Sequence, residues 1–444
     1  MATAGITTNL KKLMLNLLES DIDSDTYYVG LARSNETIDF SGTESSTLAE
    51  QRGLRNQLHS VKVLSKTNLV VPTIEWQGNN TYTPYDDDND DLTNFYVVNS
   101  KREIFVCIEV SKNVDGTTNP STVEPTSNLA GTQQKSFRTV DGYLWRFLHA
   151  VNNGVYSDFK NISYMPVSKI DLLNPTLLED ITSTTLQDSS VAGEILSIAI
   201  DSGGQGYTTI PGITIQGNGI SAAFVATLSN GVITRIQVDS DDANVYTHGS
   251  GFDFAKVTPS YGDAVLRPVI GPSAGFSSDP RDTLQARHVS LKVDFDNTET
   301  GTILAENDFQ TVAIMKNVNT PAGAAFSGNT GNALNSFTLS SVQGGSTFNE
   351  DEFINTSSGV ASGKVFHWDG ANTLYYYQND STGYGTFTSG LGITTPSGGA
   401  ATINAINLPD IDRYSGEILY INNFVEVARD ANQTEDIRLV LELD

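Results

Sequence analysis

The chain has 444 residues, enough for about three domains of ordinary size. Charged residues make up only 18%, and Ser, Thr, Asn and Gly fill the difference, a mixture typical of β-rich proteins with many turns. The 52 acidic and 26 basic residues give a formal net charge of −26, which disfavours binding to nucleic acid or to an anionic membrane.

The sequence also predicts where the chain is made. No apolar run approaches the ~20 residues that a membrane helix needs, and the N-terminal residues lack the pattern of a signal peptide. Cys107 is the only cysteine, which excludes an intrachain disulfide. It lies in the apolar run 105–108, so we expect a buried strand residue rather than a reactive thiol. We therefore expect a soluble chain made in a reducing compartment.

An amphipathic helix is predicted near the N-terminus. Five apolar residues share one face at helical spacing, while Lys11, Lys12, Asn16 and Glu19 take the other. The apolar residues are Leu10, Leu13, Met14, Leu17 and Leu18. This face packs either on its own domain or against a partner chain, because terminal amphipathic helices serve both purposes.

Short strands follow, with one further helix. The Thr47–Glu50 segment has the Ser/Thr-x-x-Glu form of a capping box and predicts a helix to about Leu58. We expect strands at 26–34, at 61–71 with Pro72 as the stop, and at the pair 95–99 and 104–110. The alternating run 143–148 favours another strand over a short helix.

Two glycine-rich regions differ in composition from the rest of the chain. In the first, residues 185–275, Ile198, Ile200, Asp201, Ser202 and Tyr207 align with Ile236, Val238, Asp239, Ser240 and Tyr246, which indicates an internal duplication of a small β unit. In the second, 342–405, Asp369-Gly370 predicts a hairpin. Between and after them, strands are predicted at 287–295, 308–317 and 437–442.

The motifs that usually carry chemistry are incomplete. Asp86–Asp91 supplies the first ligands of an EF-hand, but Asp91 stands where glycine is needed and Val97 where a bidentate glutamate is needed. A looser calcium site or a solvated turn remains open there. Gly359–Lys364 is one residue too short for a phosphate-binding loop, and Gly203–Gly206 precedes strand signals rather than a helix.

The histidines and tryptophans are the remaining candidate site residues. The five histidines are scattered, with no metal-ligand spacing among them: His59, His149, His248, His288 and His367. Trp76, Trp145 and Trp368 are expected to be core residues, with interface anchoring or sugar stacking as alternatives. We predict no catalytic residue, no cofactor-binding residue, no metal ligand and no cofactor.

Three blocks of sequence resemble one known family. They are Y-Y-V-G-L-A-R-S at 27–34, the series from Trp76 to Trp145 with Y-x-x-Y-D-D at 82–87 and D-G-Y-x-W at 141–145, and R-Y-S-G-E-I-L-Y-I-N-N with Arg429 and Q-T-E-D-I-R at the C-terminal end. In order and spacing they resemble the dimeric baseplate wedge subunit of T-even-type contractile bacteriophages, in a cyanophage-like version with inserted β modules.

The resemblance implies a fold and a role. The expected fold is mainly β, a layered β-sandwich with a few short helices and inserted small β domains. Its expected parts are 1–180 (first part of the sandwich core, with the helix), 185–275 (inserted module), 280–340 (return to the core), 342–405 (second Gly/Ser-rich module) and 406–444 (closing strands). The expected role is structural, not enzymatic: a homodimer that joins neighbouring wedge proteins around a hub in the virion tail baseplate, whose rearrangement triggers sheath contraction.

Two other functions stay open at this point. A receptor-binding tail fibre or adhesin would suit the β modules and a surface bearing Tyr375, Tyr376 and Tyr377, and such proteins are usually trimers. A tail-associated polysaccharide hydrolase would need two facing carboxylates, which a sequence cannot reveal.

Overall fold

The structure is a computed structural model that describes most of the chain: residues 8–24, 26–33, 47–64, 66–127, 136–167, 190–240, 245–276, 278–295, 309–427 and 433–442. Strands hold 45% and helices 10% of the residues, so the prediction of a mainly β fold is confirmed. The chain forms two compact units. One comprises 1–19, 68–290 and 440–444, and the other comprises 20–67 and 291–439. The boundaries fall inside α1 (Thr8–Ser24), β3 (Lys66–Pro72), β17 (His288–Phe295) and β27 (Glu435–Glu442).

The first unit is built on an antiparallel sheet of four strands in the order β4-β5-β7-β6. Its strands are β4 (Tyr96–Val98), β5 (Glu103–Glu109), β6 (Ser136–Arg138) and β7 (Leu144–Ala150). Cys107 and Trp145 are paired across β5 and β7, and both are fully buried. The predictions of a strand pair at 95–110, of a strand over 143–148 and of a buried Cys107 are therefore confirmed.

The residues of the D-G-Y-x-W block bind a neighbouring loop to this sheet. Asp141 accepts hydrogen bonds from the backbone N–H groups of Thr122 and Val123 at 2.7 and 2.9 Å. Tyr143 donates its hydroxyl proton to the carbonyl of Asn119 at 2.6 Å. Trp145 stacks on Tyr143, with ring centroids 5.7 Å apart. The order of aromatic and turn residues in this stretch thus has a local structural cause, the closure of one aromatic core.

Four further elements belong to the first unit beside this sheet. They are α4 (Asn153–Phe159), β8 (Tyr164–Pro166), which pairs with residues 70–72 of β3, α6 (Pro280–Thr283), and the start of β17. α1 is fastened to α6 by its polar side. The guanidinium of Arg281 donates to both carboxylate oxygens of Glu19, at 2.7 and 3.1 Å, and Lys12 forms an ion pair with Asp282 at 3.1 Å.

A second β region of this unit covers residues 195–270. It contains a four-stranded sheet, β10-β15-β16-β9, and the ribbons β11–β14 and β12–β13. Its strands are β9 (Ile195–Ser202), β10 (Ile213–Gly217), β11 (Ile220–Ala222), β12 (Phe224–Ser229), β13 (Val232–Val238), β14 (His248–Ser250), β15 (Ala255–Pro259) and β16 (Val265–Ile270). The two segments that align in sequence begin on β9 and β13, which pair with different strands.

This region is bonded to the first sheet at several points. Arg146 forms an ion pair with Glu194 at 2.7 Å, and His248 shares a hydrogen bond of 2.9 Å with Ser136. The backbone N–H of Val238 donates to Glu109 at 2.8 Å. Buried polar side chains on both sides therefore find partners across the contact, as burial of polar groups requires.

The second unit contains a five-stranded antiparallel sheet in the order β19-β2-β1-β18-β26. Its elements are β1 (Tyr27–Ala32), α2 (Leu48–Gln57), β2 (Leu58–Val63), β18 (Phe309–Lys316), β19 (Thr330–Asn332) and β26 (Glu417–Val427). Thr47 caps α2 with both bonds of a capping box, as predicted. The prediction of one strand over 61–71 is wrong, because β2 ends at Val63 and β3 begins at Lys66, each in a different sheet.

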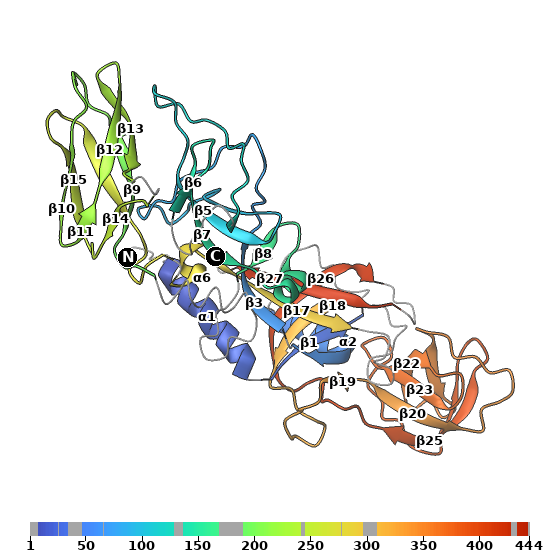
Figure 1. The fold of residues 1–444 in the computed structure, drawn as a ribbon. Coiled ribbons are helices and arrows are strands. Elements are labelled where there is room, and N and C mark those ends of the chain that lie inside the picture. The colour runs from blue at the N-terminus through green and yellow to red at the C-terminus, as the bar shows by residue number, and fades with distance from the viewer. Residues whose placement is uncertain are drawn as a thin grey trace. The chain divides into compact units, whose positions relative to one another are not determined.

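The second unit also holds a closed barrel with the strand order β20-β23-β22-β21-β24-β25 (Figure 1, orange to red). The strands are β20 (Asn335–Ser340), β21 (Phe353–Thr356), β22 (Ser362–Trp368), β23 (Thr373–Tyr377), β24 (Gly392–Thr394) and β25 (Ala400–Asn407). The hairpin predicted at Asp369-Gly370 joins β22 to β23, and Gly370 has a φ of +77°. Closure leaves no free sheet edge.

The predicted strands at 287–295, 308–317 and 437–442 are present as β17, β18 and β27. Arg429, part of the C-terminal block, and the stretch 168–180 of the first predicted part lie outside the described residues. Within the described ranges, no helix combines the length and the hydropathy needed to cross a membrane.

Candidate functional site

The three tryptophans take part in packing. Trp145 is fully buried, and Trp76 packs on the same aromatic cluster, with its indole N–H donating to Ser121 at 3.2 Å. Trp368 is partly buried against the barrel core, edge-on to Phe348 at 5.2 Å. Packing therefore leaves these rings little free face on which a sugar could stack.

The expectation of an exposed tyrosine surface at 375–377 is wrong. Tyr376 is buried and stacks on Phe337 at 4.1 Å, while Tyr375 and Tyr377 are half-buried. The hydroxyl of Tyr377 donates to Asp351 at 2.7 Å. Alternation along β23 explains the result, because every second side chain of a barrel strand points inward.

The acidic turn at 86–91 already holds a cation from the protein itself. Arg267 donates to both carboxylate oxygens of Asp86, at 2.8 and 2.7 Å, and lies 3.7 Å from Asp87. The Arg267 guanidinium lowers the pKa of Asp86. In the described part of the chain, no group of three or more His, Cys, Asp or Glu side chains could hold a metal ion. The looser calcium site considered from the sequence has no such ligand set there.

The histidines lie far apart in the chain and do not form a site. Burial lowers the pKa of His149 and of His248 to about 3, so both are neutral in the folded protein at pH 7. His248 is bonded at both ring nitrogens, to Ile195 O at 3.0 Å and Ser136 Oγ at 2.9 Å. Burial also raises the pKa of Cys107 well above its usual value, so its thiol is unreactive.

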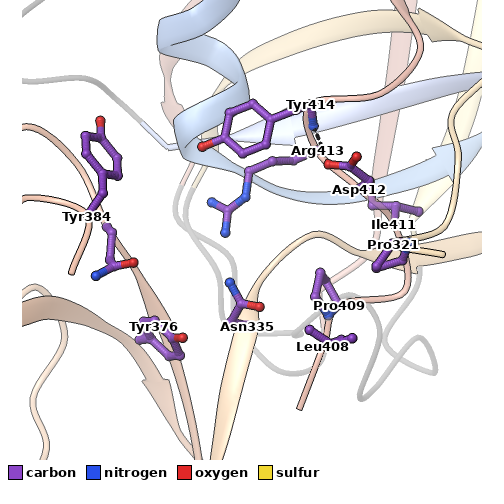
Figure 2. A pocket seen from close by; sticks show the side chains of 11 residues that line it. Pro321, Asn335, Tyr376, Tyr384, Leu408, Pro409, Ile411, Asp412, Arg413 and Tyr414 are labelled. Atoms are coloured by element: carbon purple, nitrogen blue, oxygen red, sulfur yellow. Dashed lines mark hydrogen bonds between the residues drawn. The ribbon is translucent and has the colours of Figure 1, made fainter. Parts of the chain in front are cut away.

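A pocket of about 370 Å³ opens in the second unit, beside the barrel (Figure 2). It forms where β20 begins, where the loop after β23 returns, and where the chain passes from β25 to β26. The lining residues are Pro321, Asn335, Tyr376, Gln378, Tyr384, Leu408, Pro409, Ile411, Asp412, Arg413 and Tyr414. The volume lies in the lower part of the range for small-molecule sites.

The turn at 412–416 is held in place from α2. Arg55, in the last turn of that helix, donates to the carbonyls of Arg413, Ser415 and Gly416 at 2.9, 2.6 and 2.8 Å. Asp412 accepts from the backbone N–H of Tyr414 at 2.9 Å (Figure 2, dashed line). Three charge-assisted bonds to backbone make this wall of the pocket a preorganised one.

Arg413 is the central polar residue of the pocket. Its side chain is 8% exposed, and burial lowers its pKa. Its one hydrogen bond to another described residue runs from Nη1 to the carbonyl of Asn56 at 3.2 Å, and no described carboxylate forms an ion pair with it. Figure 2 shows the guanidinium extending into the space between Tyr384 and Asn335. Donor groups of a buried cation therefore face the pocket without an acceptor among the described residues.

Two tyrosines form the rim. Tyr384 and Tyr414 are 54% and 59% exposed, and their hydroxyls are joined through Asn56. Tyr414 donates to Asn56 Oδ1 at 2.9 Å, the amide of Asn56 donates to Tyr384 at 3.3 Å, and Tyr384 donates to Asp380 at 2.9 Å. Burial and Asp380 raise the pKa of Tyr384 to about 12, so the hydroxyl stays protonated at neutral pH. The bonds orient both rings without covering them.

Neither a family model nor a curated protein matches this chain. The assignment of a role to the pocket therefore depends on its own chemistry. The lining contains one carboxylate, Asp412, and no His, Cys or Ser. It offers aromatic faces together with hydrogen-bond donors and acceptors, which is the composition of a binding site.

Sequence reasoning missed this pocket. Tyr384 stands between two glycines in a polar loop, and Arg413-Tyr414 was noted only as part of the C-terminal block. The one weak signal was a large aromatic residue in a turn-rich loop, because loops carry a large share of binding residues.

A second candidate surface is the outer face of α1. The predicted helix is present, but Leu10, Leu13, Met14 and Leu17 of its predicted apolar stripe are exposed. The buried side chains are instead Leu15, Glu19 and Ile22, another set at helical spacing. Glu19 does lie on the face opposite the leucines, but that face is the one that is buried at Glu19. The apolar stripe is therefore left without a partner in the described structure.

Proposed function

We propose that this protein is a structural subunit of the baseplate wedge of a bacteriophage contractile tail. In this role it assembles as a homodimer, joins neighbouring wedge proteins around the central hub, and takes part in the rearrangement that triggers sheath contraction. The ordered resemblance of the three sequence blocks supports the assignment. The work of such a subunit is done by interfaces rather than by a reaction.

The observation that carries the proposal is the exposed apolar stripe of α1. Leu13 and Leu17 are 53% and 59% exposed, and Leu10 and Met14 extend the stripe over two turns. Full burial of an exposed side chain of this kind contributes about 1.5–3 kcal/mol. The four side chains are already about half covered, so docking gains roughly half of that for each of them. Contiguous apolar surface of this kind marks an interaction site in a soluble protein.

The charge order of α1 favours a second copy as the partner. Lys11 and Lys12 lie near its N-terminus, while Glu19, Asp21 and Asp23 lie toward its C-terminus. That order opposes the helix macrodipole, which favours anions at the N-terminus and cations at the C-terminus. Lys12, Glu19 and Asp21 already form ion pairs within the chain, with Asp282, Arg281 and Lys316. Two α1 helices packed antiparallel place opposite ends of the helix dipoles side by side, and this dipole pairing favours a second copy.

The first test is the absolute mass of the purified chain by light scattering after size exclusion. We expect about twice 47.8 kDa. A double variant, Leu13→Glu with Leu17→Glu, is expected to be monomeric, because two carboxylates in the stripe oppose its burial. Ile162→Glu is the control, since Ile162 is 97% exposed and belongs to another surface.

Two results would redirect the assignment. A stable trimer would favour the receptor-binding fibre or adhesin, and a dimer that survives both glutamates would remove α1 from the interface. Dimerisation alone does not identify a wedge protein, so the second stage is co-assembly with the neighbouring wedge proteins of the same phage. Particles from infected cells should then contain the chain in the tail baseplate after synthesis in the host cytoplasm.

A further inference from the structure

The pocket around Arg413 carries an inference that goes beyond an assembly role. We propose that it binds an uncharged saccharide, a glycan segment whose terminal ring enters between Tyr384 and Tyr414. The free polar groups of the pocket, its aromatic rings and the charge of the chain all favour such a ligand.

The free hydrogen-bonding groups include both donors and acceptors. Arg413 supplies donors only, and the amide of Asn335 supplies one group of each kind without a bond to any described residue. Gln378 donates both amide protons to backbone carbonyls, at 2.8 Å each, which leaves its side-chain oxygen as an acceptor. Asp412 also accepts only. Sugar hydroxyls both donate and accept, so they suit a lining that offers groups of both kinds.

An anionic ligand fits this set less well. A carboxylate or phosphate would satisfy Arg413, but it would also meet the oxygens of Asp412 and Gln378, which repel it. At longer range the net charge of −26 repels any polyanion. The same charges do not oppose an uncharged polyol.

The aromatic residues supply the apolar part of the recognition. Tyr384 and Tyr414 flank the opening with exposed ring faces, and the C–H faces of a sugar ring pack on such surfaces. Tyr376 forms the inner wall and is kept in place by its stack on Phe337. Because Asn56 and Arg55 hold the rim and the turn at 412–416 before binding, little ordering is needed when a ligand arrives.

The size of the pocket favours a sugar over a protein segment. About 370 Å³ accommodates one or two rings. A stable protein partner covers roughly 800 Å² on each side, which is far more than this opening offers.

The test is a titration of the full chain with a panel of trisaccharides: maltotriose, cellotriose, chitotriose and, as the anionic member, trigalacturonate. Saturation-transfer NMR detects binding, and calorimetry gives the affinity. We expect at least one of the three neutral sugars to bind and trigalacturonate to bind more weakly. Tyr384→Ala should weaken that binding by about tenfold, since half of the rim is removed.

Tyr261→Ala is the matched control, because Tyr261 is a half-exposed tyrosine of the other unit and should leave affinity unchanged. Asn335→Ala is a second variant that removes polar recognition while keeping the rim, and circular dichroism checks the fold of all three. Three results would overturn the proposal: no neutral sugar binds, trigalacturonate binds best, or both Tyr384→Ala and Asn335→Ala bind as tightly as the original chain. None of these results bears on the mass of the dimer.

Discussion

At the scale of single residues, buried polar groups without partners are the most informative. His149 lies on β7, fully buried, and neither ring nitrogen bonds to a described residue. An unpartnered buried group costs about 1–3 kcal/mol. Arg413 differs from it in one respect: Arg413 lines a pocket, whereas both ring nitrogens of His149 are fully buried. The first is a group that a ligand could satisfy, and the second is a cost that the fold carries.

The pH dependence of the free energy of unfolding should reveal the buried, neutral state of His149. Its pKa is about 3 in the folded chain and about 6.5 when unfolded, so the unfolded state binds the extra proton between these values. The titration of His149 therefore costs no stability above about pH 6.5. As the pH is lowered below that value, this group reduces the free energy of unfolding by about 1.4 kcal/mol per pH unit. We expect the free energy of unfolding of His149→Leu to fall less on acidification than that of the original chain. At pH 7 the variant should be at least as stable. The measurement is urea denaturation from pH 4 to pH 7, and parallel curves for the two proteins would contradict the assignment.

At the scale of elements, local signals gave correct predictions where they involve neighbours in sequence. The capping box at Thr47 and the Asp369-Gly370 hairpin are both present, since each depends on bonds within a few residues. The face that α1 buries depends instead on a residue distant in sequence. Its sequence offers two stripes at helical spacing, and the choice depends on Arg281, which lies about 260 residues away. Tyr376 was misjudged because only the closed barrel decides which face of β23 is inside.

The candidate pocket could not be predicted from the sequence, because it too depends on contacts between distant segments. Asn335, Tyr376, Tyr384 and Arg413 come from four separate segments, and none has a spacing that marks a ligand site. The mainly β fold, in contrast, followed from composition and alternation, because turn residues and short alternating runs are distributed along the whole chain.

The ion pair between Glu19 and Arg281 is expected to fasten α1. Removing one partner of a buried pair leaves the other charge uncompensated and costs about 3–5 kcal/mol. In Glu19→Ala we therefore expect the amides of residues 10–18 to lose protection from hydrogen exchange, while those of β5 keep theirs. Asn16→Ala, on the exposed face of the same helix, is the control. Unchanged protection in Glu19→Ala would mean that Leu15 and Ile22 hold the helix without the charges.

At the scale of the whole molecule, the net charge of −26 opposes the approach of two copies. The attraction between apolar stripes acts only at contact. The electrostatic repulsion acts over the screening length, about 10 Å at 0.1 M salt and about 3 Å at 1 M. The balance between the two sets the concentration at which a dimer forms. A chain of this kind stays apart when dilute and associates when concentrated or screened.

We accordingly expect the dimer to become tighter by several-fold when sodium chloride is raised from 0.1 to 1 M, because screening removes repulsion and leaves burial of the stripe. Sedimentation equilibrium at several loading concentrations measures this. The Leu13→Glu, Leu17→Glu variant should remain monomeric throughout. Dissociation of the original chain by salt would instead indicate an interface made of ion pairs.

The barrel in the second unit has its first and last strands side by side, with Ser336 paired to Asn407. The polypeptide therefore enters and leaves this segment at points only about 5 Å apart. A recombination event that exchanged the intervening stretch between two genes would replace Tyr376, Gln378 and Tyr384, yet keep Arg413, Tyr414 and the whole of α1. Such a swap would alter which sugar the pocket prefers and leave the dimer as it was, so ligand choice and assembly are able to evolve independently in this chain.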